Sequence, residues 1–365
     1  MLGVVVMRRS PPPHAHAPPH APPHAPLLSR RATLMGILAA AALGTPAVAR
    51  AQESEGNRTI DGSIKRSRVL KSSSGARGVT LHLELVNNPF PVPGSPQRDA
   101  TMLAFVPHHY RAAEDGTVAT VVHFHGYSSD VDAAVEKHQL REQLHESKQN
   151  AILLVPEVVA NAASSAVGKL EVDGGFNRML VDALDTLNLA SARHALGDAH
   201  LPPRAAVGRV CVSAHSGGYH GAACAISQGG VGVNEVYLFD ALYADVEKFK
   251  AWVLAGKGKP MKNRHKLVSY YTGGTTATNT QALFAELTKA GVRTAEETVE
   301  GTLSREQITL AEAVSIKTGL SHGAVTSDLR SLRDCLFAST LPRQLHAGWF
   351  QAKTGSRTLD KAKDR

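Results

Sequence analysis

Val210-Cys-Val-Ser-Ala-His-Ser-Gly-Gly-Tyr219 is the stretch of this 365-residue chain that decides its fold. The first half is rich in apolar residues, which predicts a buried strand, and small residues then continue as far as Ser227. This order indicates a strand, a tight turn that carries Ser216, and a helix packed closely behind the turn. A serine on such a turn is exposed above the sheet, where its hydroxyl can attack a carbonyl carbon. Ala214 replaces the first glycine of a Gly-x-Ser-x-Gly pattern with a residue that is nearly as small.

Residues 1–51 have the composition of a signal or leader segment. Ser29-Arg-Arg-Ala-Thr-Leu-Met35 resembles a bacterial twin-arginine export signal, and the apolar residues 36–49 are too few for a stable membrane anchor. Ala49-Arg-Ala51 is typical of a cleavage site, so we expect the mature chain to begin at Gln52. The resemblance implies passage through the export machinery and a periplasmic or secreted location.

Charge and cysteine content exclude several classes of protein. The chain has 40 basic and 32 acidic residues, but five of the arginines and none of the acidic residues lie in the leader. The remaining 35 basic and 32 acidic residues leave a net charge of +3, which does not indicate a nucleic-acid partner. Three cysteines do not make a disulfide framework, although they leave a single disulfide open.

Strands and helices alternate along the rest of the chain. We expect residues 52–77 to be a flexible segment, residues 78–348 to form one catalytic domain, and residues 349–365 to form a charged tail. Strands that are apolar on both faces and alternate with helices predict an α/β fold. It should have a mostly parallel eight-stranded sheet, an antiparallel N-terminal edge and helices on both faces. The predicted strands are 79–86, 100–106, 118–125, 151–155, 207–213, 235–239, 267–271 and 314–318, and the predicted helices are 131–148, 176–192, 246–254, 278–290 and 324–337.

Reactive residues follow four of these predicted strands, where functional groups gather in parallel sheets. Gly126 and Tyr127 follow the third strand, and a glycine turn there leaves backbone N–H groups free to hold an oxyanion. Ser216, Asp240 and His322 follow the fifth, sixth and last strands, in the chain order nucleophile, acid, base.

Together these motifs resemble the α/β-hydrolase superfamily over residues 78–340. The matching segments are His125-Gly126, Ala214-His-Ser-Gly-Gly218 and Ser321-His-Gly323. In most of that family the acid follows the seventh strand, whereas here the corresponding segment, Thr272-Gly-Gly-Thr-Thr-Ala-Thr278, contains no carboxylate. Asp240 takes its place one strand earlier, as in some members, and Asp245 is the alternative acid.

The resemblance implies acyl transfer by a Ser-His-Asp triad without a metal or an organic cofactor. His322 would take the proton of Ser216, and Asp240 would fix the imidazole. The backbone N–H groups of Gly217 and of Tyr127 or Gly126 would bind the oxyanion. The residues expected to line the substrate site are His125, His215 and Tyr219.

Several functions share this machinery, and the substrate cannot be read from the sequence. An exported hydrolase of a small or polymeric carboxylic ester is the default, with a serine peptidase or amidase as the alternative. A metal-dependent hydrolase could instead use His123 and His125, which form a His-x-His pair. A non-catalytic scaffold that binds a ligand is the third hypothesis, although a scaffold does not need all three triad residues.

Overall fold

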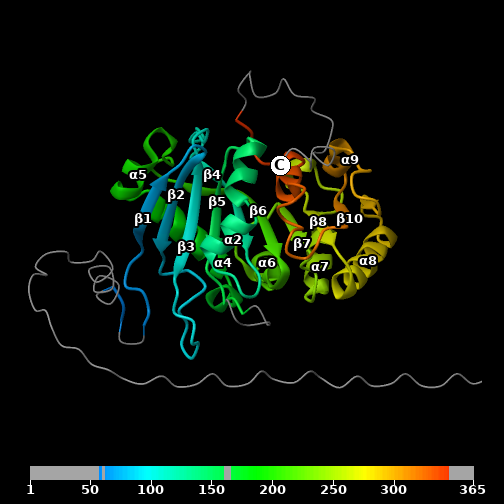
Figure 1. Ribbon diagram of the computed structural model, residues 1–365, viewed down its shortest axis with the longest axis horizontal. Coiled ribbons are helices and arrows are strands. Elements are labelled where there is room, and N and C mark those ends of the chain that lie inside the picture. The colour runs from blue at the N-terminus through cyan, green and yellow to red at the C-terminus, as the bar shows by residue number, and fades with distance from the viewer. Residues whose placement is uncertain (1–56, 60–61, 160–165, 345–365) are drawn as a thin grey trace, which may run out of the picture. The chain divides into compact units, whose positions relative to one another are not determined.

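The computed structural model describes residues 57–59, 62–159 and 166–344. The predicted leader with its cleavage site, and the charged tail, lie outside these residues. Ten strands in the described part form one sheet in the order β1-β2-β3-β5-β4-β6-β7-β8-β10-β9. The four strands β1, β2, β3 and β5 pair antiparallel in succession, and every pair from β5 to β9 is parallel. The expected mostly parallel sheet with an antiparallel N-terminal edge is confirmed (Figure 1).

Eight of the ten strands are those that the sequence predicts. They are β2 (Gly78–Glu84), β3 (Thr101–Pro107), β4 (Thr117–Phe124), β5 (Ala151–Pro156), β6 (Ala206–His215), β7 (Glu235–Phe239), β8 (Lys266–Tyr271) and β10 (Ala313–Lys317). The sheet has ten strands rather than the eight expected, because it includes two further edge strands, β1 (Arg68–Ser74) and β9 (Thr294–Glu297). β1 is exposed and polar over its second half, and β9 is four residues long with a single apolar residue, Ala295, so neither has the apolar pattern by which a strand is recognised.

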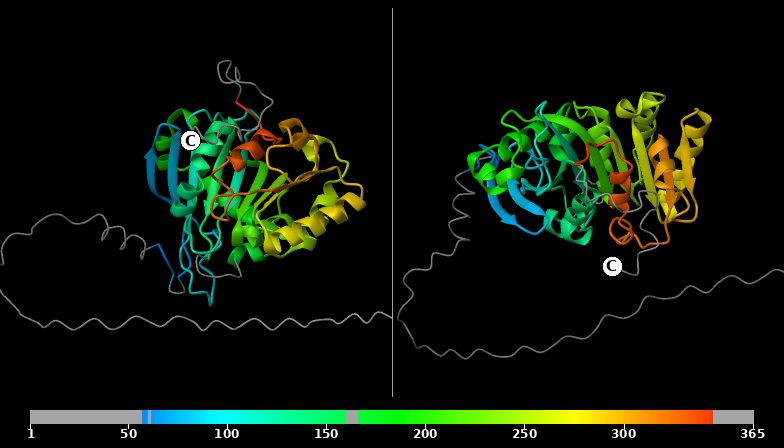
Figure 2. Two further views of the ribbon diagram at one scale, coloured as in Figure 1. Left: turned by 45° about the vertical axis from the view of Figure 1, so that its right-hand side comes forward. Right: turned by 90° about the horizontal axis from the view of Figure 1, so that it is seen from above.

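Helices cover both faces of the sheet (Figure 2). One apolar core lies beneath α4 (Gly175–Leu187), α5 (Ala190–Leu196), α6 (Tyr219–Gln228), α7 (Val246–Gly256) and α8 (Gly274–Lys289). The second core lies beneath α2 (Val131–Lys137), α3 (Leu140–Ser147), α9 (Arg305–Leu310) and α10 (Ser331–Phe337). Strands β3 to β8 and β10 each supply residues to both cores, because successive side chains of a strand point to opposite faces of the sheet.

Three predicted helices are broken or shortened in the structure. The helix expected over 131–148 is broken into α2 and α3 where Gln139 has a left-handed φ of 51°. The helix expected over 176–192 ends at Leu187, and α5 begins at Ala190. The helix expected over 324–337 begins only at Ser331, because residues 322–329 form successive turns.

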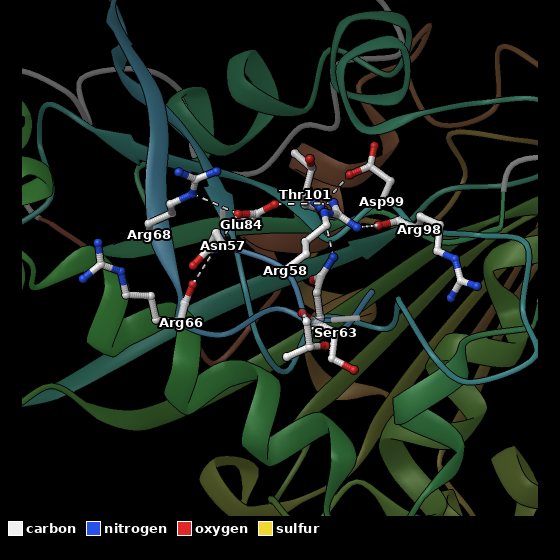
Figure 3. Close-up of polar contacts among 11 residues, drawn as sticks. Asn57, Arg58, Ser63, Arg66, Arg68, Glu84, Arg98, Asp99 and Thr101 are labelled. Carbon is white, nitrogen blue, oxygen red and sulfur yellow. Dashed lines mark hydrogen bonds and ion pairs between the residues drawn. The ribbon is translucent and has the colours of Figure 1, made fainter. Parts of the chain in front are cut away.

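Residues before β2 are joined to the sheet by a polar network around Glu84 (Figure 3). The Glu84 carboxylate accepts hydrogen bonds from Asn57 Nδ2 at 2.8 Å and from Arg68 Nε at 2.9 Å. Arg58 also pairs with Glu84 and donates to the carbonyl of Arg98. This network and strand β1 give much of the region expected to be flexible a defined structure.

The three cysteines, Cys211, Cys224 and Cys335, are free and buried. Among the described residues, no helix combines the length and the apolar character needed to cross a bilayer.

Candidate active site

Ser216 lies on a strained turn at the carboxyl end of β6. Its φ of 53° is in the left-handed region, which costs a non-glycine residue roughly 1–3 kcal/mol. The turn is a single 3₁₀ segment, Ser216–Gly218, that leads directly into α6. Gly218 makes this geometry possible, since a Cβ there would lie 2.2 Å from the carbonyl oxygen of Phe124 on the neighbouring strand. The small residues of the motif therefore allow close packing, and the serine is raised above the sheet.

Asp240 follows β7, also with a left-handed φ, of 48°. Its carboxylate accepts hydrogen bonds from the backbone N–H of Thr272 at 3.0 Å, from the Thr272 hydroxyl at 2.8 Å, and from the Thr276 hydroxyl. Burial opposes ionisation most strongly, but the hydrogen bonds with His322, Thr276 and Thr272 outweigh it and lower the pKa of Asp240 to about 2. Asp240 is consequently a carboxylate at any physiological pH.

His322 lies in the loop after β10 and faces this carboxylate. Its Nδ1 is 2.6 Å from Asp240 Oδ2, and its side chain is 43% exposed. Because Asp240 takes Nδ1–H, Nε2 is the ring nitrogen left to accept a proton. The exposed Tyr243 ring stands edge-on to His322, with centroids 6.4 Å apart.

Asp245, the alternative acid, is paired with a different imidazole. Its Oδ2 lies 2.7 Å from His220 Nδ1, and its Oδ1 lies 3.0 Å from Lys248 Nζ. Of the two carboxylates, Asp240 is the one that contacts His322.

The loop after β4 passes directly over Ser216. A Cβ built on Gly126 would lie 2.7 Å from Ser216 Cβ and 3.2 Å from Ser216 Oγ, so only glycine fits at this distance. Tyr127, the next residue, is 58% exposed. The Gly126–Tyr127 peptide is therefore beside the serine, as an oxyanion donor has to be.

Glu157 fixes the start and the end of this loop, a role that the sequence analysis missed. Its Oε2 accepts the backbone N–H of Val131 at 3.0 Å, where α2 begins, and its Oε1 lies 3.3 Å from His125 Nε2. The signal was present, since Glu157 directly follows strand β5 and so lies at the same edge of the sheet.

Two of the three residues expected to line the substrate site are buried. His125 is 1% exposed and points toward Glu157 and the backbone of Val158. His215 is 6% exposed and its Nε2–H donates to the carbonyl oxygen of His322 at 2.8 Å. Tyr219 is half-buried, with its ring 6.3 Å from that of Tyr243, and is the one of the three that is still partly exposed.

His123 on β4 and His125 just after it have different partners. His123 Nδ1 lies 2.8 Å from Ser213 Oγ, whereas His125 is paired with Glu157. Within residues 57–59, 62–159 and 166–344 no three His, Cys, Asp or Glu side chains are grouped to hold a metal ion. The arrangement instead combines a serine on a strained turn, an imidazole oriented by a carboxylate, and backbone N–H groups, which are the components of acyl transfer.

No protein-family model matches this chain, and no curated protein matches it. Its structural neighbours are α/β-hydrolase enzymes. An S-formylglutathione hydrolase from Agrobacterium tumefaciens is 11% identical, with a TM-score of 0.43 over 74% of this chain and 98% of that one. A feruloyl esterase module from Clostridium thermocellum is 9% identical, with a TM-score of 0.42 over 80% of this chain and 94% of that one. EstE1, a carboxylesterase cloned from a metagenomic library, is 15% identical, with a TM-score of 0.37 over 82% and 98% of the two chains.

Proposed function

We propose that the protein is a serine hydrolase that cleaves carboxylic esters through an acyl-enzyme on Ser216. The observation that carries the proposal is the 2.6 Å contact between His322 and Asp240 at the edge of the sheet where Ser216 occupies its strained turn. A carboxylate in this position holds the imidazole in the tautomer that can accept a proton from a nucleophile, and it stabilises the imidazolium that forms.

In the proposed reaction, His322 Nε2 removes the Ser216 proton as Oγ attacks the ester carbonyl carbon. The backbone N–H groups of Gly217 and Tyr127 receive the negative charge on the carbonyl oxygen, and each such donor lowers the barrier by about 3–4 kcal/mol. The imidazolium then protonates the leaving alcohol, and the C–O bond of the ester breaks. Water, activated by the same imidazole, releases the acid and restores Ser216.

Labelling with a fluorophosphonate probe tests the nucleophile. Wild type should be labelled, Ser216→Ala should not, and His322→Ala should be labelled very slowly because the serine then lacks its base. Ser227→Ala is the matched control, because Ser227 lies at the far end of the same helix and donates to the carbonyl of Ala223. Unchanged labelling of Ser216→Ala would refute the proposal.

Ester and amide substrates of the same acyl group then separate the two hydrolase classes. We expect turnover of p-nitrophenyl esters of graded chain length and little turnover of the matched anilides. Preferential cleavage of anilides or peptides would assign the peptidase alternative instead.

We further propose that the protein acts outside the cytoplasm, on the basis of the export-signal resemblance at residues 29–35. Amino-terminal sequencing of the protein from the periplasm or medium of a bacterial host should begin at Gln52. Recovery of the uncleaved chain in the cytoplasm alone would contradict this proposal.

A further inference from the structure

His215 immediately precedes Ser216 and is bonded to the loop that carries His322. Its Nε2–H donates to the His322 carbonyl oxygen at 2.8 Å, and the two ring centroids are 4.7 Å apart. A carbonyl oxygen only accepts hydrogen bonds, so this contact fixes His215 as the Nε2–H tautomer. One side chain therefore joins the strand that presents the nucleophile to the loop that presents the base.

Two further histidines support His215 from behind. The ring of His138, at the end of α2, stands edge-on to His215 with centroids 4.5 Å apart. His138 Nδ1 lies 3.2 Å from Nε2 of His123, and His123 Nδ1 lies 2.8 Å from Ser213 Oγ. We call His123, His138 and His215 the histidine row; all three are buried. The row thus has a fixed position, since β4, α2 and β6 each contribute one member.

The surroundings of the row keep it uncharged. Burial is the main cause that lowers the pKa of His215 to about 4, with Lys137 and His322 adding repulsion and the His322 carbonyl and Asp240 opposing them. Burial likewise lowers the pKa of His138 to about 2 and that of His123 well below its ordinary value, and His125 adds repulsion to both. A neutral row places no second positive charge beside His322 when that residue becomes an imidazolium.

The loop that carries His322 needs such a support. Gly319, Ser321 and His322 are exposed, and a Cβ on Gly319 would meet no atom within 4 Å. Two hydrogen bonds join His322 to the ends of other strands: its ring to Asp240, and its carbonyl oxygen to His215. The bond to Asp240 orients the ring, and the bond to the carbonyl fixes the backbone from which the ring extends.

We propose that His215 is a positioning residue, which sets the place of the His322 imidazole relative to Ser216 through its hydrogen bond to the His322 carbonyl. The proposal rests on the hydrolase function proposed above. Misplacement of a reacting group by about 1 Å can cost on the order of 100-fold in rate. Removal of the donor should therefore lower kcat and leave the substrate-binding surface unchanged.

The test compares two substitutions of His215. His215→Leu removes the donor and should lower both kcat for a p-nitrophenyl ester and the rate of fluorophosphonate labelling by about 10- to 100-fold, with KM changed by less than roughly twofold. His215→Gln retains an N–H donor at nearly the same reach and should keep kcat within about threefold of wild type. Should His215→Leu fail to fold, His215→Asn replaces it, because its amide is too short to reach the carbonyl.

His109→Leu is the matched control for loss of a buried histidine. His109 is also 6% exposed, and its Nε2 also bonds a backbone carbonyl, that of Gln149 at 3.1 Å. Gln149 lies just before β5, at the opposite edge of the sheet from Ser216. His109→Leu should lower the unfolding temperature as much as His215→Leu does, but folded His109→Leu should be labelled at the wild-type rate.

Two outcomes would overturn the positioning role: labelling of His215→Leu at the wild-type rate, or equally slow reaction of His215→Gln and His215→Leu. Either would leave the proposed function intact as long as Ser216→Ala stays unlabelled. Labelling of Ser216→Ala would instead refute the hydrolase mechanism itself, so the two failures are distinguishable.

Discussion

Asp245 Oδ2 lies 2.7 Å from His220 Nδ1, so the two carboxylates after β7 contact two different imidazoles. Asp240 and Asp245 are five residues apart, both have a left-handed φ, and the pKa of each is lowered mainly by hydrogen bonds that outweigh its burial. The two carboxylates differ in the imidazole that each one contacts. Asp240 meets His322, whereas Asp245 joins the start of α6 to the start of α7.

The first prediction follows from this difference in partners. Asp240→Asn replaces an acceptor by an amide that can present N–H to His322 Nδ1, which favours the wrong tautomer and should lower kcat by about 10⁴-fold. Asp245→Asn should leave kcat within about threefold of wild type, since its partners His220 and Lys248 take no part in the proposed reaction. Steady-state kinetics with a p-nitrophenyl ester measures both. The reverse ranking would make Asp245 the acid.

The second prediction concerns the close approach of Gly126 to Ser216. Gly126→Ala would place a methyl group 2.7 Å from Ser216 Cβ and 3.2 Å from the nucleophilic oxygen. The loop must then move away, which withdraws the Tyr127 N–H from the oxyanion and should lower kcat by at least about 100-fold.

Gly232→Ala is the control for this substitution, because a Cβ at Gly232 would meet no atom within 4 Å. That variant should have wild-type kinetics. Full activity of Gly126→Ala would show that the loop after β4 does not supply an oxyanion donor.

The third prediction concerns Glu157, whose buried carboxylate contacts both ends of the same loop. Glu157→Gln removes the charge that strengthens its hydrogen bond from Val131 N–H, and loss of a charge-assisted bond should cost about 2 kcal/mol of unfolding free energy. Because the loop also carries Gly126, kcat should fall while KM changes less. Glu136→Gln is the control, since Glu136 is exposed and pairs with Arg141 at the surface. Urea unfolding and ester kinetics measure the two effects, and equal stability of the two variants would contradict the prediction.

Reactive residues follow parallel strands, and this rule locates Ser216, Asp240 and His322 along the sequence. It does not predict which side chains these residues contact. Ser216 directly follows β6, Asp240 directly follows β7, and His322 lies in the loop after β10. The direction of a side chain depends on packing between segments distant in the chain. The burial of His125 and His215, and the partners that each of them contacts, could not be read from the sequence for this reason.

The hydroxyl-rich segment after β8 illustrates the same limit. The sequence shows that it contains no carboxylate, but not that the hydroxyls of Thr272 and Thr276 donate to Asp240. The segment supplies the hydrogen-bond donors that keep Asp240, at the end of the neighbouring strand β7, ionised. The edge strands β1 and β9 were missed for a different reason: their backbones pair with the sheet while their side chains remain polar.

Buried neutral histidines make the stability of the fold depend on pH. Burial is the main cause that lowers the pKa of His109 and of His215 from 6.5 to about 4. A histidine whose pKa is lower in the folded state contributes stability that is fully present above pH 6.5 and is lost as the pH falls toward 4, because the unfolded chain binds the proton first.

The fourth prediction is therefore a loss of stability in mild acid that glutamine substitutions reduce. Between about pH 7.5 and pH 5, each of these two histidines should cost the folded state about 2 kcal/mol. His109→Gln and His215→Gln keep an N–H donor but cannot take a proton, so each should lose about 2 kcal/mol less than wild type over this interval. Urea unfolding at both pH values measures the difference. The exposed His108, replaced by glutamine, is the control and should not change the pH dependence. If the two buried variants lose as much stability as wild type, His109 and His215 do not remain neutral in the folded protein.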